Sequence, residues 1–176
     1  MQTILISGGA NGADSLFEEC AKFKGHQCII YKAGVIESIA HKESYDKFLI
    51  YLNLYLKRKY PTDNEYINDL LRRDVLIGMH ADTVFAVGTL DADSKIRGGT
   101  AWTSYTFMTK YKFGIIPFYF FDQELAVWYQ VHLKDGNVIF EQLKESPKIV
   151  GCSRYGGIGT RNLNQNGIDA IRGLYK

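Results

Sequence analysis

The chain has few of the residues that usually form a metal or redox site. Its three cysteines, Cys20, Cys28 and Cys152, include no C-x-x-C pair. Structural zinc sites need clustered thiolates or imidazoles, and disulfide frameworks pair their cysteines. The four histidines show no H-x-x-x-H or H-x-x-E spacing either. We therefore expect no bound metal, no cofactor and no disulfide, but reduced thiols in a cytoplasmic protein.

Long apolar runs and an excess of charge of one sign are also missing. No stretch approaches the roughly 18 apolar residues of a membrane span, and the first residues lack the basic and apolar regions of a signal peptide. Lys and Arg number 21 against 19 Asp and Glu, a net charge of only +2. We expect a soluble, unexported chain without a membrane partner, and the weak charge argues against a nucleic-acid partner.

Three common motifs of nucleotide binding and catalysis are absent as well. The sequence has no G-x-x-x-x-G-K-[ST], which argues against ATP hydrolysis of the P-loop type. A strict G-x-G-x-x-G and the G-x-S-x-G elbow of serine hydrolases are missing too.

What the sequence does contain is an alternation of short apolar strands and helical patterns. Strands are predicted at 2–7, 27–31, 83–87 and 114–121, and helices at 14–24, 44–60, 64–77 and 101–112. A D-G pair between 126–133 and 138–143 predicts an antiparallel hairpin at one edge. The pattern predicts one α/β domain over 1–176, a Rossmann-like three-layer fold with a mostly parallel sheet, and a helical insertion near 40–62.

Three glycine-rich segments, 8–14, 97–100 and 156–161, are predicted to be loops that lead from a strand into a helix. In a parallel sheet these loops meet at the carboxyl edge, where ligands of open α/β folds bind. Bare backbone amides and helix N-termini favour phosphate there. We predict a phosphate or pyrophosphate pocket to which Arg97 and Arg161 add bidentate contacts, with hydroxyl groups from Ser15, Thr100, Thr103 and Thr160.

Several stretches resemble one superfamily. "SGGANGADS", residues 7–15, resembles the SGGAxGAD signature of the SLOG superfamily, which includes the DNA-processing protein A fold, the lysine decarboxylase-like phosphoribohydrolases and sensors of nucleotide-derived signals. "RRDVLIGMHADTVFAVGTLD" and "RGGTAWTSYTF" are similar to its second half. "GGIGTRNLNQNGIDAIRGLY" resembles an element that normally precedes the SGGA unit. The resemblance therefore implies a circularly permuted order, with the last strand beside the first.

The resemblance implies which residues bind a nucleotide. One wall would be Gly8, Gly9, Gly12, Ala13 and Asp14; the phosphate would lie on Gly98, Gly99 and Thr100; and Gly157, Gly159, Thr160 and Arg161 would close the other side. Asp14 has a second interpretation as a carboxylate favoured by the helix dipole. Arg73 and Asp74 match the superfamily's R-N or R-D pair, but adjacent helical residues point in different directions, so they are alternatively surface charges.

The chain departs from the phosphoribohydrolases at one point. Their PGGxGTxxE run supplies a catalytic glutamate, whereas "RGGTAWTSY" has no acid in the first helical turns. The leading hypothesis is therefore a sensor or sequestering protein for a nucleotide-derived small molecule. The alternatives are an N-glycosidic hydrolase of nucleoside monophosphates or related ribosyl compounds, with Asp14 or Glu18 as the relocated carboxylate, and a single-stranded DNA binder of the DNA-processing type.

Two further expectations concern context. The small size, the insertion and the permuted order suit a phage or mobile-element protein. The tyrosine-rich 44–60 helix offers a surface for a homo-oligomer. Its basic end, residues 57–59, either complements the helix dipole or forms a docking surface.

Overall fold

The computed structural model describes residues 2–34 and 39–176, and the side chains of 39 and 40 are left out. The strands are β1 (Ile4–Ser7), β2 (Gln27–Ile30), β3 (Thr83–Gly88), β4 (Gly114–Asp122), β5 (Val127–Lys134), β6 (Asn137–Gln142) and β7 (Arg154–Gly159). The helices are α1 (Ala13–Phe23), α2 (Ile39–Leu56), α3 (Glu65–His80), α4 (Thr100–Met108) and α5 (Gln165–Leu174). In this part of the chain no helix has the length and apolar character needed to span a membrane.

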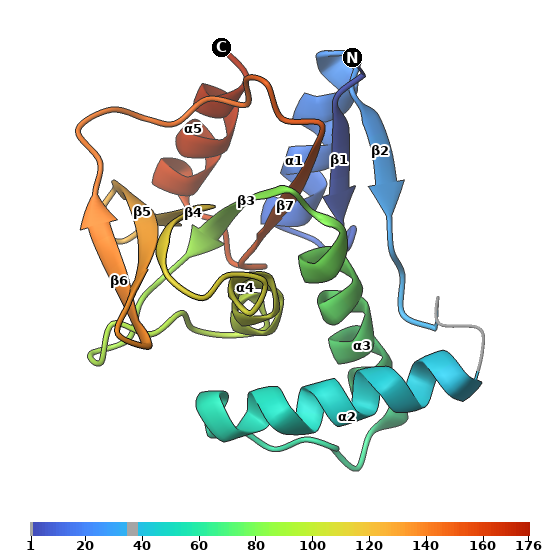
Figure 1. Cartoon of the computed structure of the whole chain (residues 1–176). Helices are drawn as coiled ribbons and strands as arrows, with labels where there is room; N and C mark the ends of the chain where they lie inside the picture. Colours follow the sequence, from blue (N-terminus) through green and yellow to red (C-terminus); the bar gives the residue numbers. More distant parts are fainter. Residues whose placement is uncertain (1, 35–38) are drawn as a thin grey trace.

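The predicted fold class is confirmed. One sheet of order β2-β1-β7-β3-β4-β5-β6 runs through the molecule, parallel from β2 to β4 and antiparallel from β4 to β6 (Figure 1). The predicted hairpin is β5 and β6. Its two turn residues, Asp135 and Gly136, have φ of 52° and 76°. Two successive positive φ values give the turn that matches the twist of a two-residue hairpin.

The last strand of the chain lies beside the first, as predicted from the permuted order. Gly156 of β7 faces Ile6 of β1 on one side and Val84 of β3 on the other. Both pairings are parallel. The sheet is therefore completed in its centre by residues from the end of the chain.

The third glycine segment was predicted to be a loop, and this is wrong for residues 156–159, which form most of β7. A Cβ atom on Gly157 would lie 2.7 Å from both Leu5 Cδ1 and Phe17 Cγ. A Cβ atom on Gly159 would lie 2.3 Å from the carbonyl oxygen of Val87. The bare backbone here lets α1 and β3 approach the central strand closely.

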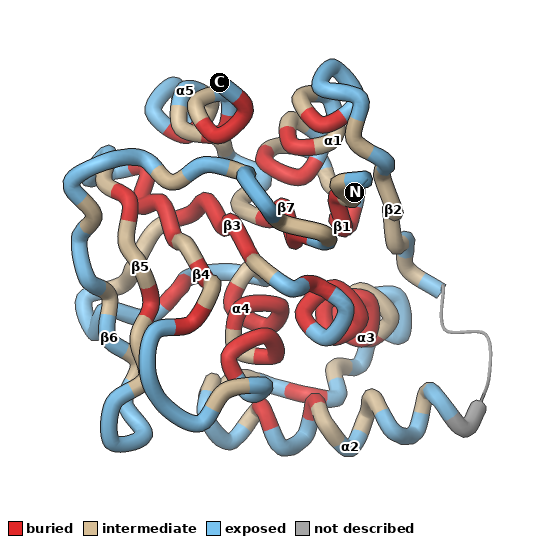
Figure 2. The backbone as a smooth tube through the Cα atoms, turned by 45° about the horizontal axis from the view of Figure 1, so that its top comes forward, coloured by how far each residue is buried: buried red, intermediate tan, exposed pale blue. Residues whose placement is uncertain are grey.

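Helices cover the sheet on both faces. α1 and α5 pack on one face through Phe17 and Ile171, which join Phe85 and Tyr155 in a buried cluster. α3 and α4 pack on the other face, where Phe107 belongs to a second cluster. Figure 2 shows these inward surfaces as buried. The alternation of the two clusters along β1 and β3 explains why both strands are apolar at successive positions.

The insertion forms a third layer on the α3 and α4 side. Leu49 and Leu52 of α2 pack on Val75 and Trp102, so α2 covers α3 and α4 rather than the sheet (Figure 1). The helix ends at Leu56, earlier than the predicted residue 60, because the next residue, Lys57, is left-handed with φ of 51°.

The outer surface of α2 carries four exposed large hydrophobic residues, Ile50, Tyr51, Leu54 and Tyr55. The expected homo-oligomer stays a prediction, because the structure holds a single chain.

The packing of β7 predicts opposite effects for two glycine substitutions. Gly157→Ala should lower the free energy of unfolding by about 1–3 kcal/mol, because the new methyl group overlaps Leu5 and Phe17. Gly173→Ala in α5, where a Cβ meets nothing within 4 Å, should raise it by up to about 1 kcal/mol. Urea denaturation of both variants measures this. If both variants changed the free energy of unfolding equally, β7 would be shown to tolerate a side chain at Gly157.

Candidate functional site

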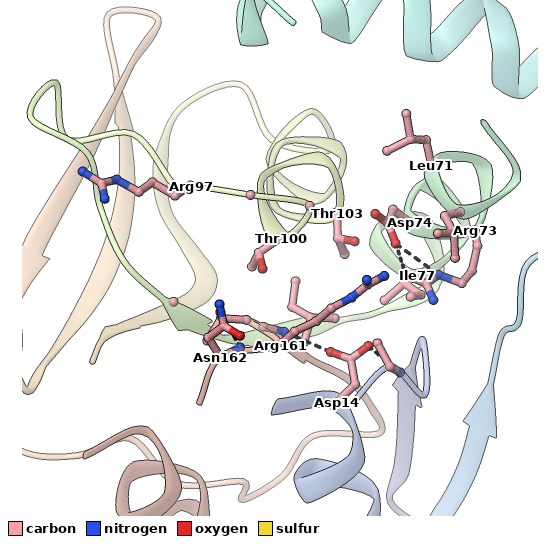
Figure 3. A pocket seen from close by; sticks show the side chains of 18 of the residues that line it. Asp14, Leu71, Arg73, Asp74, Ile77, Arg97, Thr100, Thr103, Arg161 and Asn162 are labelled. Atoms are coloured by element: carbon pink, nitrogen blue, oxygen red, sulfur yellow. Dashed lines mark hydrogen bonds and ion pairs between the residues drawn. The ribbon is translucent and has the colours of Figure 1, made fainter. Parts of the chain in front are cut away.

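A cavity of about 390 Å³ lies at the carboxyl edge of the sheet, where the predicted glycine segments meet (Figure 3). We call it the edge cavity. Its walls come from the loop after β1, from α3, from the segment that leads into α4 and from the end of β7. The predicted site residues that line it are Asp14, Arg97, Gly98, Gly99, Thr100, Thr103, Gly159, Thr160 and Arg161. All three predicted segments thus contribute to one cavity.

Other predicted residues serve packing or lie elsewhere. A Cβ atom on Gly12 would lie 2.5 Å from the carbonyl oxygen of Thr160, so this glycine lets two loops touch. Ser15 donates its hydroxyl to the Gly12 carbonyl at 2.9 Å, and Glu18 forms an exposed ion pair with Lys22. These residues, together with Ala13 and Gly157, are not among the described residues that line the edge cavity, whereas Gly8 and Gly9 line a neighbouring one.

The start of α4 presents unused hydrogen-bond donors to the edge cavity. Among the described residues, no group accepts a hydrogen bond from the backbone N–H of Gly98, Gly99 or Thr100, whereas the following N–H groups of α4 already donate to carbonyls. A Cβ atom on Gly99 would have its nearest neighbour, Asp74 Oδ2, at 4.0 Å, so the backbone there is open to the cavity. Free N–H groups and the helix dipole favour an anion at this place.

A free guanidinium faces the same space. Arg161 follows β7, and Figure 3 shows its side chain reaching across the edge cavity towards Thr103 and α3. It forms no ion pair or side-chain hydrogen bond with other described residues, and it is exposed. Arg97 is also exposed, but Figure 3 shows its side chain directed away from Thr103 and Arg161. Of the two predicted arginines, Figure 3 thus shows Arg161, and not Arg97, directed into the space between α3 and α4.

A buried pair of charges from α3 forms another wall. Asp74 Oδ1 accepts hydrogen bonds from Arg73 Nε at 3.2 Å and from Arg73 Nη2 at 2.8 Å. Arg73 Nη1 donates to the carbonyl oxygen of Gly8 at 3.0 Å, which fixes the loop after β1. The interpretation of these two residues as surface charges is therefore wrong. The long arginine side chain folds back on its neighbour, so adjacency on the helix does not separate them.

Asp14 combines both roles that the sequence left open. It lies in the first turn of α1, and it also lines the edge cavity. Its Oδ1 accepts from the N–H of Gly159 at 3.0 Å, and its Oδ2 accepts from the N–H of Ala10 at 3.4 Å. The carboxyl thus ties the start of α1 to the end of β7 and to the loop after β1. α4 has no acid in its own first turn, and the atom nearest to a Cβ on Gly99 would be Asp74 Oδ2 at 4.0 Å.

Burial raises the pKa of both carboxyl groups of the cavity, those of Asp14 and Asp74. It raises the pKa of Asp14 to about 7, opposed by the positive charge of Arg73 and reinforced by the negative charge of Asp74. Burial likewise raises the pKa of Asp74 to about 6, opposed by the positive charges of Arg73 and Arg161. Each carboxyl therefore exchanges its proton near neutral pH. Such groups are suited to donate or accept a proton, and they also occur in purely structural networks.

The insertion reaches the site through Arg58, just after α2. Its Nη1 donates to the carbonyl oxygen of Gly98 at 2.6 Å, and its Nη2 donates to that of Ile96 at 3.2 Å. The two bonds tie the segment before α4 to the insertion. The basic end of the predicted helix was interpreted as a dipole complement or a docking surface. For Arg58, the structure shows an internal contact instead.

The remaining wall is apolar and was not predicted from the sequence. Ile67, Leu70, Leu71 and Ile77 of α3 line the edge cavity. Their spacing of three and four residues is the ordinary signal of a helix that faces the core. This spacing could have identified the apolar wall of the edge cavity only if the position of α3 in the fold had been known. No group of three or more His, Cys, Asp or Glu residues in the described part of the chain could hold a metal ion.

Comparison of the chain with protein-family models, with curated proteins and with solved structures found no match. Membership of the SLOG superfamily therefore stays a prediction. The chemistry of the site rests on its geometry alone: N–H groups at the start of α4 without an acceptor among the described residues, the exposed guanidinium of Arg161, two protonatable carboxyls and an apolar wall.

The raised pKa of Asp14 predicts a pH-dependent stability. Its folded pKa of about 7 lies above the ordinary value of 3.8, so its contribution is full below about pH 4 and is lost as the pH rises through 7. Between these values the free energy of unfolding should fall more steeply in the wild type than in Asp14→Asn, by at most about 1.4 kcal/mol per pH unit. Urea denaturation from pH 4 to 8 measures both slopes. Parallel curves would contradict the raised pKa.

The bonds of Arg58 predict that the insertion orders the segment that leads into α4. In Arg58→Ala the carbonyl groups of Ile96 and Gly98 lose their donor. We expect amide hydrogen exchange of Arg97, Ala101 and Trp102, whose N–H groups donate to backbone carbonyls, to rise about tenfold, since local opening there becomes easier. The exposed neighbour offers a control: Lys57→Ala should leave this exchange unchanged. Similar protection in both variants would show that the segment holds its shape without Arg58.

Proposed function

We propose that this protein binds a nucleotide or a nucleotide-derived small molecule in the edge cavity and acts as a sensor or sequestering protein. One observation carries the proposal: the free N–H groups at the start of α4 and the unpaired guanidinium of Arg161 line the same cavity, opposite an apolar wall. Anion donors on one side and aliphatic side chains on the other match a molecule with a phosphate and a ring. The volume of about 390 Å³ falls in the usual range of small-molecule sites.

The proposed orientation places the phosphate on Gly99 and Thr100. Thr103 of α4 and Arg161 after β7 also line the cavity, and their hydroxyl and guanidinium supply further donors. The ring would then lie against Leu70 and Leu71 of α3. Apolar contact between the ring and these aliphatic side chains gives affinity without selecting a particular base. The phosphate position therefore restricts the choice of ligand more than the base does.

The protonation state of Asp74 would affect this binding. Its Oδ1 accepts both bonds from Arg73, whereas its Oδ2 points towards Gly99 and accepts no hydrogen bond from a described residue. A protonated Oδ2 would donate to a phosphate oxygen, and an ionised one would repel it. With a pKa of about 6, Asp74 weakens phosphate binding as the pH rises through that value.

A second function is favoured by a separate observation. Asp14 and Asp74 line the same cavity, and their raised pKa values, about 7 and about 6, let each exchange a proton near neutral pH. A general acid that protonates the leaving base, with water attacking the ribose carbon, is the requirement for cleavage of an N-glycosidic bond into free base and ribose phosphate. Glu18, the other candidate, pairs with Lys22 outside the cavity. If the protein is a hydrolase, Asp14 and Asp74 are its acids.

The proposal predicts that a nucleotide is bound by the wild type and lost in Gly99→Asp. A Cβ fits at Gly99 without overlap, so the variant should fold, while its carboxylate would occupy and repel the phosphate position. Mass spectrometry of molecules released by denaturing freshly purified protein identifies the ligand, and equilibrium dialysis against nucleoside mono- and diphosphates gives affinities. We expect binding to fall at least about a hundredfold, roughly the loss of several charge-assisted hydrogen bonds.

The control for this experiment is Gly173→Ala, which lies in α5 away from the cavity and should bind like the wild type. Equal binding by all three proteins, or no binding of any nucleotide, would overturn the proposal. Incubation of the wild type with nucleoside monophosphates separates the two functions. Release of free base that disappears in Asp14→Asn, with binding retained, would favour the hydrolase over the sensor.

A further inference from the structure

A second chamber, of about 470 Å³, adjoins the edge cavity. We call it the outer chamber. Its floor is the loop after β1, including Gly9 and Asn11, and its sides are Lys32 after β2 and Tyr66 at the start of α3. Four residues line both spaces: Ala10, Leu70, Arg73 and Arg161. The two spaces therefore meet along one shared wall, on which Arg161 supplies a free positive charge.

The outer chamber differs from the edge cavity in charge. Lys32 and Arg161 line it, neither forms an ion pair with a described residue, and no carboxylate is among the described residues of its lining. Asp14 and Asp74, by contrast, line the edge cavity. A phosphate group near the shared wall would be attracted by Lys32 from the outer side and by Arg161 from the side of the edge cavity, where the charge of Arg161 also acts on Asp74.

Tyr66 gives the outer chamber an aromatic surface. Its side chain is 63% exposed, and its ring makes no contact with another ring in the described part of the chain. Its backbone is held at the start of α3, because its N–H donates to the capping side chain of Asn64 at 3.0 Å. An exposed tyrosine ring at this place is suited to stack on a planar ring.

The floor of the outer chamber is bare and held in place. Gly9 has φ of 62°, and a Cβ on it would lie 2.6 Å from Ile30 Cγ2, so the loop turns closely over β2. Arg73 holds the same loop through the carbonyl of Gly8. Asn11, exposed on this loop, presents an amide that both donates and accepts. The chamber thus combines fixed walls with groups able to hydrogen-bond a sugar or a base edge.

We propose that the ligand is a nucleotide with two ring-bearing halves joined by a diphosphate, one half in the edge cavity and the other in the outer chamber against Tyr66. This inference rests on the proposed function of the edge cavity. Arg161 lies on the wall shared by both spaces and contacts the diphosphate, while Lys32 neutralises it from the outer side. A mononucleotide fills the edge cavity alone and leaves Tyr66 unused.

The test compares matched ligands. Nucleoside monophosphates and the corresponding dinucleosides joined by a diphosphate, with adenosine, guanosine and uridine in turn, are titrated calorimetrically into the wild type, Tyr66→Ala and Tyr66→Phe. Stacking of a base on an aromatic side chain predicts that one dinucleoside diphosphate binds the wild type at least about tenfold more tightly than its monophosphate. Tyr66→Ala should remove this gain without changing binding of the monophosphate, and Tyr66→Phe should keep it.

Tyr55→Ala is the matched control, since Tyr55 is an exposed tyrosine of α2 outside both linings, and it should bind both ligands like the wild type. Equal affinity for the two ligands, or an equal loss for both in Tyr66→Ala, would overturn the inference and leave the proposed function standing. Absence of binding for every ligand would overturn both.

Discussion

The close packing of β7 between β1 and β3 is the constraint on which the rest of the structure depends. Because Gly157 and Gly159 have no side chains, α1 and β3 lie directly against this strand. The residues after β7 then reach the start of α1, where the N–H of Ala13 donates to the carbonyl of Thr160 at 3.0 Å. Asp14 accepts from the N–H of Gly159. Without this register, Arg161 would not face the start of α4.

The order of strands and helices, the hairpin and the location of the cavity could all be predicted from the sequence. These features follow from local periodicity and from the rule that strand-to-helix loops share one edge. The role of each glycine could not be predicted. Gly157 and Gly99 have the same bare backbone, but Gly157 touches Leu5 and Phe17, whereas Gly99 faces open space. Only the positions of neighbouring elements separate a glycine needed for packing from one that leaves room for a ligand.

The charged wall shows the same dependence on long-range contacts. Arg73 and Asp74 are adjacent in a helix, and a helical wheel separates them, yet both are buried because α3 lies between the sheet and α2. Arg58 is equally unpredictable, since its partners are carbonyl groups about forty residues along the chain. Long side chains can fold back on their own helix or reach another element. The local sequence pattern therefore says least about the environment of such side chains.

The starts of α1 and α4 both lie at the cavity, but they differ in whether their first N–H groups have hydrogen-bond acceptors. At the start of α1 the N–H of Ala13 donates to the Thr160 carbonyl and that of Ser15 donates to the Ala10 carbonyl, while the carboxyl of Asp14 accepts from residues outside the helix. α4 begins with Gly99 and Thr100 and has no acid in its first turn. The N–H groups of Gly98, Gly99 and Thr100, by contrast, have no acceptor among the described residues. The carbonyl of Thr160, placed there by the end of β7, thus uses the first donor of α1, whereas the first donors of α4 stay available.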